Sequence, residues 1–397
     1  MSEKPLSVTM ILTGAGLDST EGGSLTRIVQ VSKRLMRQAK IIFVATEGSA
    51  ETCRRNGIVD GVFLARSSFI KKRETSKVDR IVSYLVCTLS SILVVIRLPK
   101  ADIVYTESDG FFDLIPAVVF KVVRGAKLVV TSHHMIHFRT DNSRYGIAVL
   151  PTLIAQRLSY IIMRVFADRI QVLNSPAGME IAQYFIRQGV LPSGIKFVSN
   201  GVDARKIQNI KYGADSGFDA CAVGVLRPNK GLYDIVSIWS EVCKKSDNAK
   251  LAIIGSTFPG YLGSIKRDIK LAGLSSNIIL RGYVAWDSMI QTIKSSKVFL
   301  NPSYEEGWGI AVSEALACGT PVVAYRLPAY SVFGGAISEV ELGNKREFAA
   351  RTIRIMSDST LRGLLAEEGR KIAEELDWEE ISQLELASLV DLKRGAQ

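Results

Sequence analysis

Short apolar runs alternate with longer amphipathic segments twice along this chain, and that alternation limits its fold more than any other feature. The first stretch includes the runs SVTMIL and AKIIFVA, and the second includes NAKLAIIG and KVFLN. Each run has the length of one buried strand, and helices fit between them. Strands that alternate with helices form parallel sheets covered by helices on both faces. The sequence therefore predicts an α/β fold with two doubly wound domains.

A polar segment without periodicity, QNIKYGADSG, separates the two stretches. We expect a first domain over residues 1–205, a linker over 206–217 and a second domain over 218–379. A chain of 397 residues is long enough for two such cores. Residues 380–397 carry a helical pattern. Because open α/β sheets bind ligands beyond the carboxyl ends of their strands, we expect the two domains to face a central cleft.

The loop PSYEEGWG follows the predicted strand KVFLN and precedes a predicted helix over about residues 308–317. Pro321 prevents this helix from continuing, and the run PVVAY then predicts another strand. The first amides of such a helix have no partner within it and attract anions. Gly309, Ile310 and Ala311 therefore form a candidate anion site.

Two glutamates flank this candidate site. Glu306 precedes the helix, and Glu314 lies about a turn and a half into it. With ~1.5 Å of rise per helical residue, their carboxylates would stand roughly 8–12 Å apart, which suits a long ligand with a negative group in the middle. The alternative is that Glu306 only complements the helix dipole and that Glu314 is a solvated surface residue.

The same loop and helix resemble the signature of retaining nucleotide-sugar glycosyltransferases of family 4, the glycosyl transferases group 1. The matching residues are Pro302, Ser303, Glu306, Gly307, Trp308, Gly309, Glu314, Ala315, Cys318, Gly319, Thr320 and Pro321. The resemblance implies the GT-B fold of two Rossmann-like domains, with the last helix crossing back onto the first domain. It also implies that Glu306 contacts the donor sugar and that Glu314 contacts the ribose.

Other residues take their expected roles from this resemblance. Lys230, in the segment GVLRPNKG, matches a lysine that binds the donor diphosphate. The usual arginine position is Val225, and Arg227 lies two residues later, where it either replaces that arginine or is a surface charge. Gly22 and Gly23 match the diglycine loop that approaches the diphosphate. A nicotinamide-dinucleotide fingerprint in the same loop lacks its third glycine.

All three histidines fall in the segment TSHHMIHF, as His133, His134 and His137. A pair four residues apart could bind zinc, but no third ligand lies nearby in the sequence. The resemblance instead places His133 against the donor sugar and implies neither a metal nor a cofactor, since the nucleotide sugar is a substrate. We expect Glu107 and Asp109, after an earlier strand, to be polar loop residues rather than catalysts.

The formal net charge of +11 favours an anionic partner. A nucleotide or a membrane surface fits better than nucleic acid, because the chain lacks zinc-finger spacing and aromatic-basic stacking motifs. Five scattered cysteines and a polar start without a secretory signal predict a cytoplasmic location.

Residues 81–96 form an uncharged apolar run, too short to span a bilayer, and residues 71–80 before it are rich in lysine and arginine. This run is either a core helix or a helix that faces the inner surface of an anionic membrane.

Together these features predict a retaining glycosyltransferase that moves a sugar from a nucleotide-diphosphate sugar to an acceptor hydroxyl. A lipid-linked or cell-envelope glycan is the candidate acceptor. The alternatives are a sugar phosphorylase or nucleotide-sugar epimerase of the same fold, or a catalytically decayed partner subunit that binds the nucleotide sugar.

Overall fold

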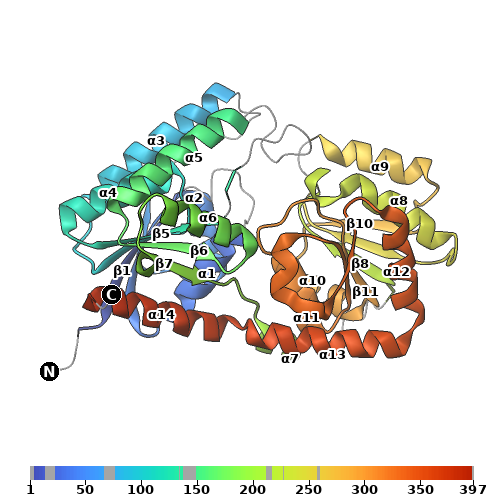
Figure 1. Ribbon diagram of the computed structural model, residues 1–397. Coiled ribbons are helices and arrows are strands. Elements are labelled where there is room, and N and C mark those ends of the chain that lie inside the picture. Colours follow the sequence, from blue (N-terminus) through green and yellow to red (C-terminus); the bar gives the residue numbers. More distant parts are fainter. Residues whose placement is uncertain are drawn as a thin grey trace. The chain divides into compact units, whose positions relative to one another are not determined.

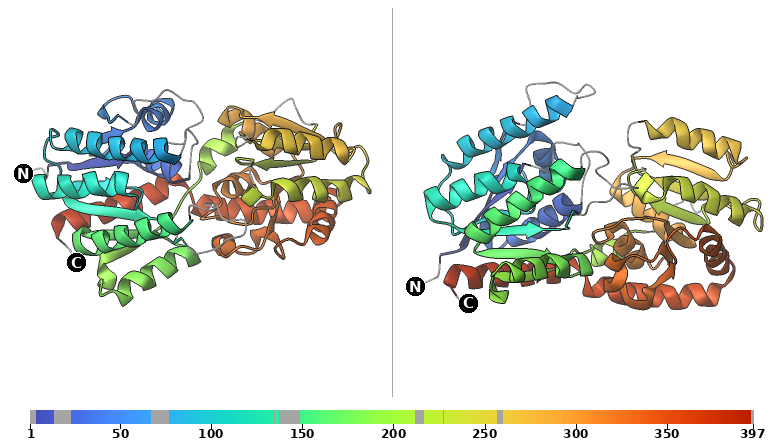
Figure 2. Two further views of the ribbon diagram at one scale, coloured as in Figure 1. Left: turned by 90° about the horizontal axis from the view of Figure 1, so that it is seen from above. Right: turned by 45° about the horizontal axis from the view of Figure 1, so that its top comes forward.

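The computed structural model describes residues 4–13, 23–66, 77–133, 135–136, 149–211, 217–226, 228–256 and 260–395. Among them, residues up to 199 together with 378–395 form one compact unit, here called the first domain, and residues 200–377 form the second domain. Each domain is a sheet with helices on both faces (Figures 1 and 2). The expected linker over 206–217 begins inside α7 (Ala204–Asn209), a short helix of the second domain whose Ala204 and Ile207 are buried.

The first sheet has seven strands in the order β3-β2-β1-β4-β5-β6-β7, and all its neighbouring strands are parallel. The strands are β1 (Leu6–Leu12), β2 (Ala39–Ala45), β3 (Val62–Leu64), β4 (Ile103–Thr106), β5 (Lys127–Ser132), β6 (Arg169–Leu173) and β7 (Ile195–Val198). Successive side chains of a strand point to opposite faces, so Met10 and Ile11 join separate cores on the two sides of the sheet.

One face of this sheet is covered by α1 (Gly23–Leu35), α2 (Glu47–Arg55) and α14 (Trp378–Arg394), whose buried side chains share one core. The other face is covered by α3 (Lys77–Val95), α4 (Phe111–Arg124), α5 (Val149–Phe166) and α6 (Pro176–Arg187). The last helix, α14, packs beside α1 (Figure 1). The prediction that the C-terminal helix crosses back onto the first domain is therefore confirmed.

The second sheet has six parallel strands in the order β10-β9-β8-β11-β12-β13. The strands are β8 (Ala220–Val223), β9 (Leu251–Ile254), β10 (Ile278–Gly282), β11 (Val298–Asn301), β12 (Val322–Tyr325) and β13 (Ile337–Val340). Its helices are α8 (Leu232–Cys243), α9 (Tyr261–Leu271), α10 (Trp286–Ser295), α11 (Ile310–Cys318), α12 (Lys345–Ser357) and α13 (Ser359–Glu375). Two doubly wound parallel sheets confirm the predicted α/β fold class.

The apolar run over residues 81–96 corresponds to α3 and the residues just after it. Cys87 and Val95 are buried, whereas Leu85, Leu89 and Leu93 are exposed. The interpretation as a core helix therefore holds for only one side of α3. No helix in the described parts of the chain is long and apolar enough to cross a membrane. Residues 71–76 of the basic stretch lie outside the described residues.

Candidate active site

The centre of the second sheet, between β8 and β11, is the point where the strand order reverses. From β8 the chain continues outward to β9 and β10, and from β11 it continues in the opposite direction to β12 and β13. Loops that leave two such strands diverge at the carboxyl edge, which is where open α/β sheets bind ligands. The loop after β8 carries Lys230, and the loop after β11 carries Glu306.

Backbone contacts hold these two loops together. Gly231 has a φ of +70°, and a Cβ atom there would stand only 2.1 Å from the carbonyl oxygen of Pro302. A side chain at this position would both strain the backbone and push the loops apart. The amide of Tyr304 in the second loop also donates a hydrogen bond of 2.9 Å to the carbonyl of Asn229 in the first. The close approach of the loops therefore depends on glycine at position 231.

This approach brings Lys230 and Glu306 into contact. Lys230 Nζ lies 2.6 Å from Glu306 Oε1, and the two side chains are 24% and 14% exposed. An ammonium group has three donors. Lys230 can therefore keep Glu306 as a partner and still donate hydrogen bonds to an anionic ligand. The structure brings together two of the predicted site residues that lie on different loops.

The helix after Glu306 begins later than predicted. Gly309 is its N-cap, with φ 100° and ψ 55°, so the helical backbone starts only at Ile310. The amides of Val312 and Ser313 donate to the Gly309 carbonyl. The amides before them belong to the first turn, which has no intrahelical acceptors. Anion binding by Gly309, Ile310 and Ala311 stays a prediction, and α11 has the geometry it requires.

Glu314 lies in the second turn of α11, and its Oε1 accepts a hydrogen bond of 2.7 Å from Trp286 Nε1 on α10. Burial raises the pKa of Glu314 to about 7; the Trp286 hydrogen bond opposes this shift and the Asp203 carboxylate adds to it. The ammonium of Lys206 lies 4.2 Å from the centre of the Trp286 ring. Glu314 is thus partly buried and held by Trp286 of α10, unlike the solvated surface residue of the alternative interpretation.

His133 belongs to the first domain and follows β5. Its Nε2 lies 3.1 Å from Glu107 Oε1. Glu107 directly follows β4 and is buried, which its position in the sequence did not indicate. Burial alone would raise the pKa of Glu107, but Arg27 and then His133 outweigh that effect, and the pKa lies below its usual value. Asp109 accepts hydrogen bonds from Ser132 and Gln156.

The buried guanidinium of Arg27, on α1, holds two carboxylates. It lies 3.0 Å from Glu107 and 2.6 Å from Glu385, which comes from α14. Gln171 on β6 donates a further hydrogen bond of 2.6 Å to Glu385. The network therefore connects the returning helix with the carboxylate that contacts His133.

Sequence reasoning missed this network, although one signal was present. Glu385 stands four residues after Ile381 and four before Leu389, on the apolar stripe of α14. A charge at a stripe position must find a buried partner, because an isolated buried charge is very costly.

Several predicted site residues lie outside the described residues: Gly22, Arg227, His134 and His137. Gly23 is described and is the exposed first residue of α1. The diphosphate contacts assigned to Gly22, Gly23 and Arg227 stay predictions.

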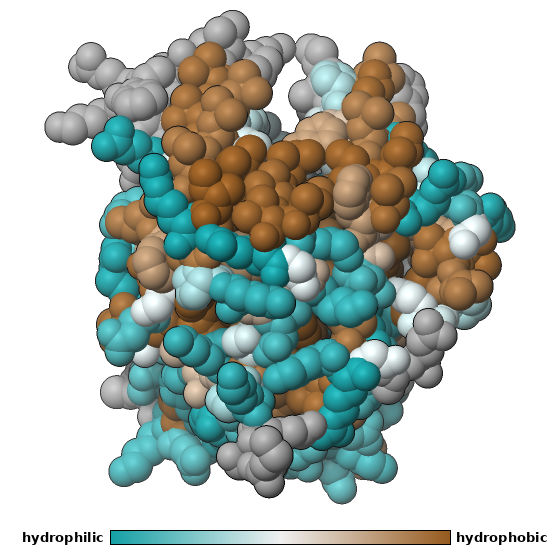
Figure 3. Space-filling view, turned by 90° about the vertical axis from the view of Figure 1, so that its left-hand side faces the viewer, coloured by the Kyte–Doolittle hydropathy of each residue, from teal (hydrophilic) through white to brown (hydrophobic). Residues whose placement is uncertain are grey.

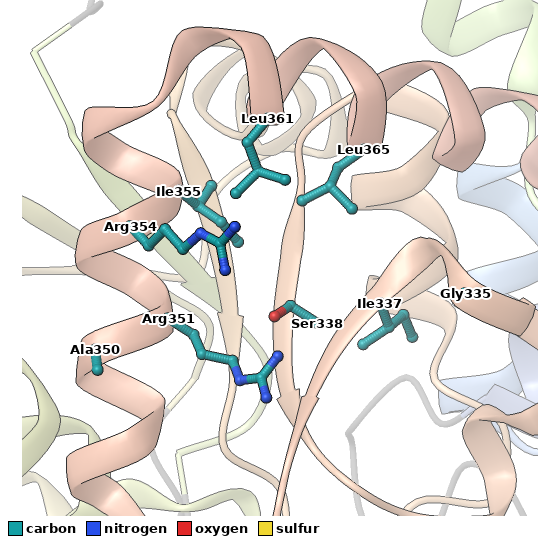
Figure 4. Close-up of a pocket in the computed structure, with 9 residues that line it drawn as sticks. All are labelled: Gly335, Ile337, Ser338, Ala350, Arg351, Arg354, Ile355, Leu361 and Leu365. Atoms are coloured by element: carbon teal, nitrogen blue, oxygen red, sulfur yellow. The ribbon is translucent and has the colours of Figure 1, made fainter.

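A cavity of about 530 Å³ lies elsewhere in the second domain, between α12, α13 and β13 (Figure 4). It shares no residue with the predicted donor site, and its lining contains no carboxylate that could hold sugar hydroxyls. Arg351, at its edge, lies 2.8 Å from Glu347 of the same helix. We therefore do not assign the donor to this cavity.

Comparisons with known proteins find similarity to glycosyltransferases. Residues 205–372 match the family described as Glycosyl transferases group 1. The capsular polysaccharide biosynthesis glycosyltransferase CapM of Staphylococcus aureus is 26% identical over 203 residues, which cover 48% of this chain and 52% of that protein. The GDP-mannose:cellobiosyl-diphosphopolyprenol alpha-mannosyltransferase of Xanthomonas oryzae is 25% identical over 242 residues, 60% of this chain and 59% of that protein. The chain thus spans between half and two thirds of these relatives.

Among solved structures, Anabaena HepE in complex with UDP and glucose superimposes with a TM-score of 0.73. The superposition covers 97% of this chain and 100% of that chain, at 16% sequence identity. At this identity the similarity establishes the fold, and the fold extends over both domains.

Proposed function

We propose that the protein transfers a sugar from a nucleotide-diphosphate sugar to an acceptor hydroxyl, because residues 205–372 match the family Glycosyl transferases group 1. The observation that carries the proposal is the contact between Lys230 and Glu306 at the point where the second sheet reverses its strand order. It offers a cation for a diphosphate and a carboxylate for sugar hydroxyls side by side.

In this proposal the donor diphosphate binds the remaining donors of Lys230 and the first amides of α11, from Gly309 to Ala311. The bond between the sugar C1 and the phosphate oxygen breaks, and a bond from the acceptor oxygen to C1 forms on the same face. The proton of the acceptor hydroxyl passes to the departing phosphate. Lys230 and the amides stabilise the charge that develops on that phosphate, so donor binding requires no metal ion. Arg227 and the Gly22–Gly23 loop would add to these contacts.

Glu314 is the proposed ribose ligand. A carboxylate can accept more than one hydrogen bond, so Glu314 can keep Trp286 and also accept a ribose hydroxyl. Glu306 would hold the sugar, and His133 is the proposed contribution of the first domain.

The relatives indicate a class of acceptor. One is named for capsular polysaccharide biosynthesis and another for a diphosphopolyprenol acceptor. We propose a lipid-linked or cell-envelope glycan as the acceptor and the cytoplasmic side of the membrane as the place of reaction.

Incubation of the purified protein with UDP- and GDP-sugars, followed by detection of the released nucleoside diphosphate, tests the function. In parallel, thermal unfolding is measured with each nucleotide, since a ligand at 100 times its Kd adds about 2.7 kcal/mol of stability. We expect stabilisation by one nucleoside diphosphate, and turnover that Glu306→Gln removes. Release of a sugar phosphate or an altered donor sugar would instead indicate the phosphorylase or epimerase, and binding without turnover would indicate the decayed partner subunit.

A further inference from the structure

Two helices of the first domain expose apolar side chains along one side. On α3 and just after it, Val82, Leu85, Leu89, Leu93 and Ile96 are between 38% and 62% exposed. Their spacing of three or four residues places them on one face of the helix. The opposite face of α3 contributes Cys87 and Val95 to the interior.

A second stripe, which the sequence analysis did not single out, lies on α5. It consists of Leu150, Ile154, Leu158, Ile161 and Val165, each between 48% and 63% exposed. The helix α4 packs against both α3 and α5 and exposes Val122 and Val123 near its end. Figure 3 shows the result as a broad hydrophobic area over these three helices.

The size of this surface, here called the α3–α5 face, is unusual for a water-exposed surface. Twelve side chains, each about half exposed, amount to an apolar area on the order of 1,000 Å², whereas the largest patch on a typical monomer is about 300–600 Å². A patch above that range marks an interaction site or a membrane-contacting surface.

The charges around the α3–α5 face are basic. Residues 81–97 and 149–166 contain no acid, and their charged residues are all arginines, of which Arg97 and Arg164 are exposed. Among the acids of adjoining segments whose side chains the structure describes, Asp113 is buried and Asp168 pairs with Lys121; Asp79 and Asp141 lie outside them. The face therefore combines apolar side chains with positive charge and complements an anionic, apolar partner.

The amino-acid composition of the α3–α5 face favours a lipid partner over a protein partner. All twelve exposed side chains are Leu, Ile or Val. Protein interfaces are enriched in Tyr, Trp, Phe, Met and Arg. Amphipathic helices that lie in the membrane interface bury such an apolar face about 5–10 Å deep and carry basic residues beside it. A membrane partner thus accounts for both the aliphatic stripes and the arginines.

We propose that the α3–α5 face docks the first domain onto the surface of an anionic membrane, with α3 and α5 in the interface. This inference deepens the proposed function, because docking would present the first domain to a lipid-linked acceptor. The docking itself depends only on the surface and can be tested without the reaction.

Sedimentation with lipid vesicles tests the proposal. Wild-type protein is mixed with phosphatidylcholine vesicles, with or without phosphatidylglycerol, at low and high salt. The test variant is Leu89→Glu/Leu158→Glu, and the matched control is Leu384→Glu, which changes a leucine of α14 that is 71% exposed in the same domain. We expect the wild type and the control to bind anionic vesicles at low salt, and the double variant to partition at least tenfold less. A milder variant, Leu93→Gln/Ile161→Gln, should show the same loss if the first variant does not fold.

Equal binding of the double variant and the wild type, or no wild-type binding at low salt, overturns the proposal. The proposal is also overturned if the wild type is a dimer in solution and the double variant is a monomer, because the α3–α5 face would then bind a second copy of the chain. Thermal unfolding with nucleoside diphosphates, measured on the same samples, separates the two proposals. Nucleotide binding without vesicle binding rejects the docking alone, and vesicle binding without nucleotide binding or turnover rejects the enzymatic function alone.

Discussion

Replacing Arg27 with methionine should selectively loosen α14 from the first domain. The guanidinium is completely buried, and the side chains of its carboxylate partners Glu107 and Glu385 are 4% and 2% exposed. Methionine approximates the length of the arginine stem but leaves both carboxylates without their cation. Breaking a buried ion pair by removing one partner costs about 3–5 kcal/mol, a large part of the 5–15 kcal/mol that stabilises a typical domain.

The matched control is Arg37→Met, in the same contact between the α1 region and α14. Arg37 lies 2.8 Å from Glu379, but its side chain is 61% exposed. Exposed ion pairs contribute about 0–1 kcal/mol, so this variant should be nearly as stable as the wild type. The comparison separates the effect of burial from that of losing any arginine near α14.

Native-state hydrogen exchange, resolved by peptide, is the appropriate assay, because a chain with two domains need not unfold in one step. Peptides of α1 and α14 should lose protection in Arg27→Met, while peptides of β8 and β11 in the second domain serve as internal controls. Adding Glu385→Gln should restore part of the protection, since one of the two carboxylates that lost Arg27 is then gone. Equal protection of α14 in Arg27→Met and Arg37→Met would refute the reasoning.

The network also fixes the direction of a pH effect. The folded pKa of Glu107 lies below its usual value, so its stabilising contribution is present above the ordinary carboxyl pKa and is lost as the pH falls through the folded pKa. Acidification should therefore weaken the network around Arg27 in the wild type, and this part of the pH dependence should become smaller in Arg27→Met, where His133 still contacts Glu107.

Three further predictions concern the second domain. Nucleotide affinity should rise as the pH passes about 7 and then level off, because Glu314 must ionise to accept ribose hydroxyls well. In calorimetry, Glu314→Gln should bind the nucleotide more weakly by about 1.5–3 kcal/mol and show no such pH dependence. Gly231→Ala should lower kcat/KM strongly. The control Gly273→Ala should not, because Gly273 has a similar φ of +72° but open space around it. Equal losses of kcat/KM would show that backbone strain alone matters. Glu306→Gln should abolish transfer while nucleotide affinity stays almost intact, and a matching loss of affinity would place Glu306 on the nucleotide instead.

The sequence was sufficient to predict most strands, because each is a short apolar run bounded by polar residues. It did not predict β3 and β13. The strand β3 has only three residues, and Phe63 and Leu64 on this edge strand are exposed, so it shows neither the length nor the burial of the other strands. The start of α11 was placed too early for a similar reason, since periodicity does not report the left-handed backbone of Gly309.

Candidate site residues could be named where a local pattern or the family resemblance marks them, and their roles stay predictions. Lys230 and Glu306 each follow a strand, and parallel strands deliver such loops to one edge of the sheet. The glycine that lets the loops meet, Gly231, has no signature of its own, because the 2.1 Å clash with Pro302 exists only in the folded structure.

The network around Arg27 shows why local patterns cannot replace the structure. Arg27 and Glu385 are 358 positions apart, and no sequence motif pairs them. Sequence alone could show only that a carboxylate stands on the apolar stripe of a helix, which demands a buried cation without saying which one. The fold supplies that cation from α1, because α14 returns to pack beside it. The return of the last helix to the first domain is thus fixed by a charge requirement as well as by its apolar stripe. Replacing Glu385 with leucine should not strengthen this contact, because Arg27 would lose one of its two carboxylates.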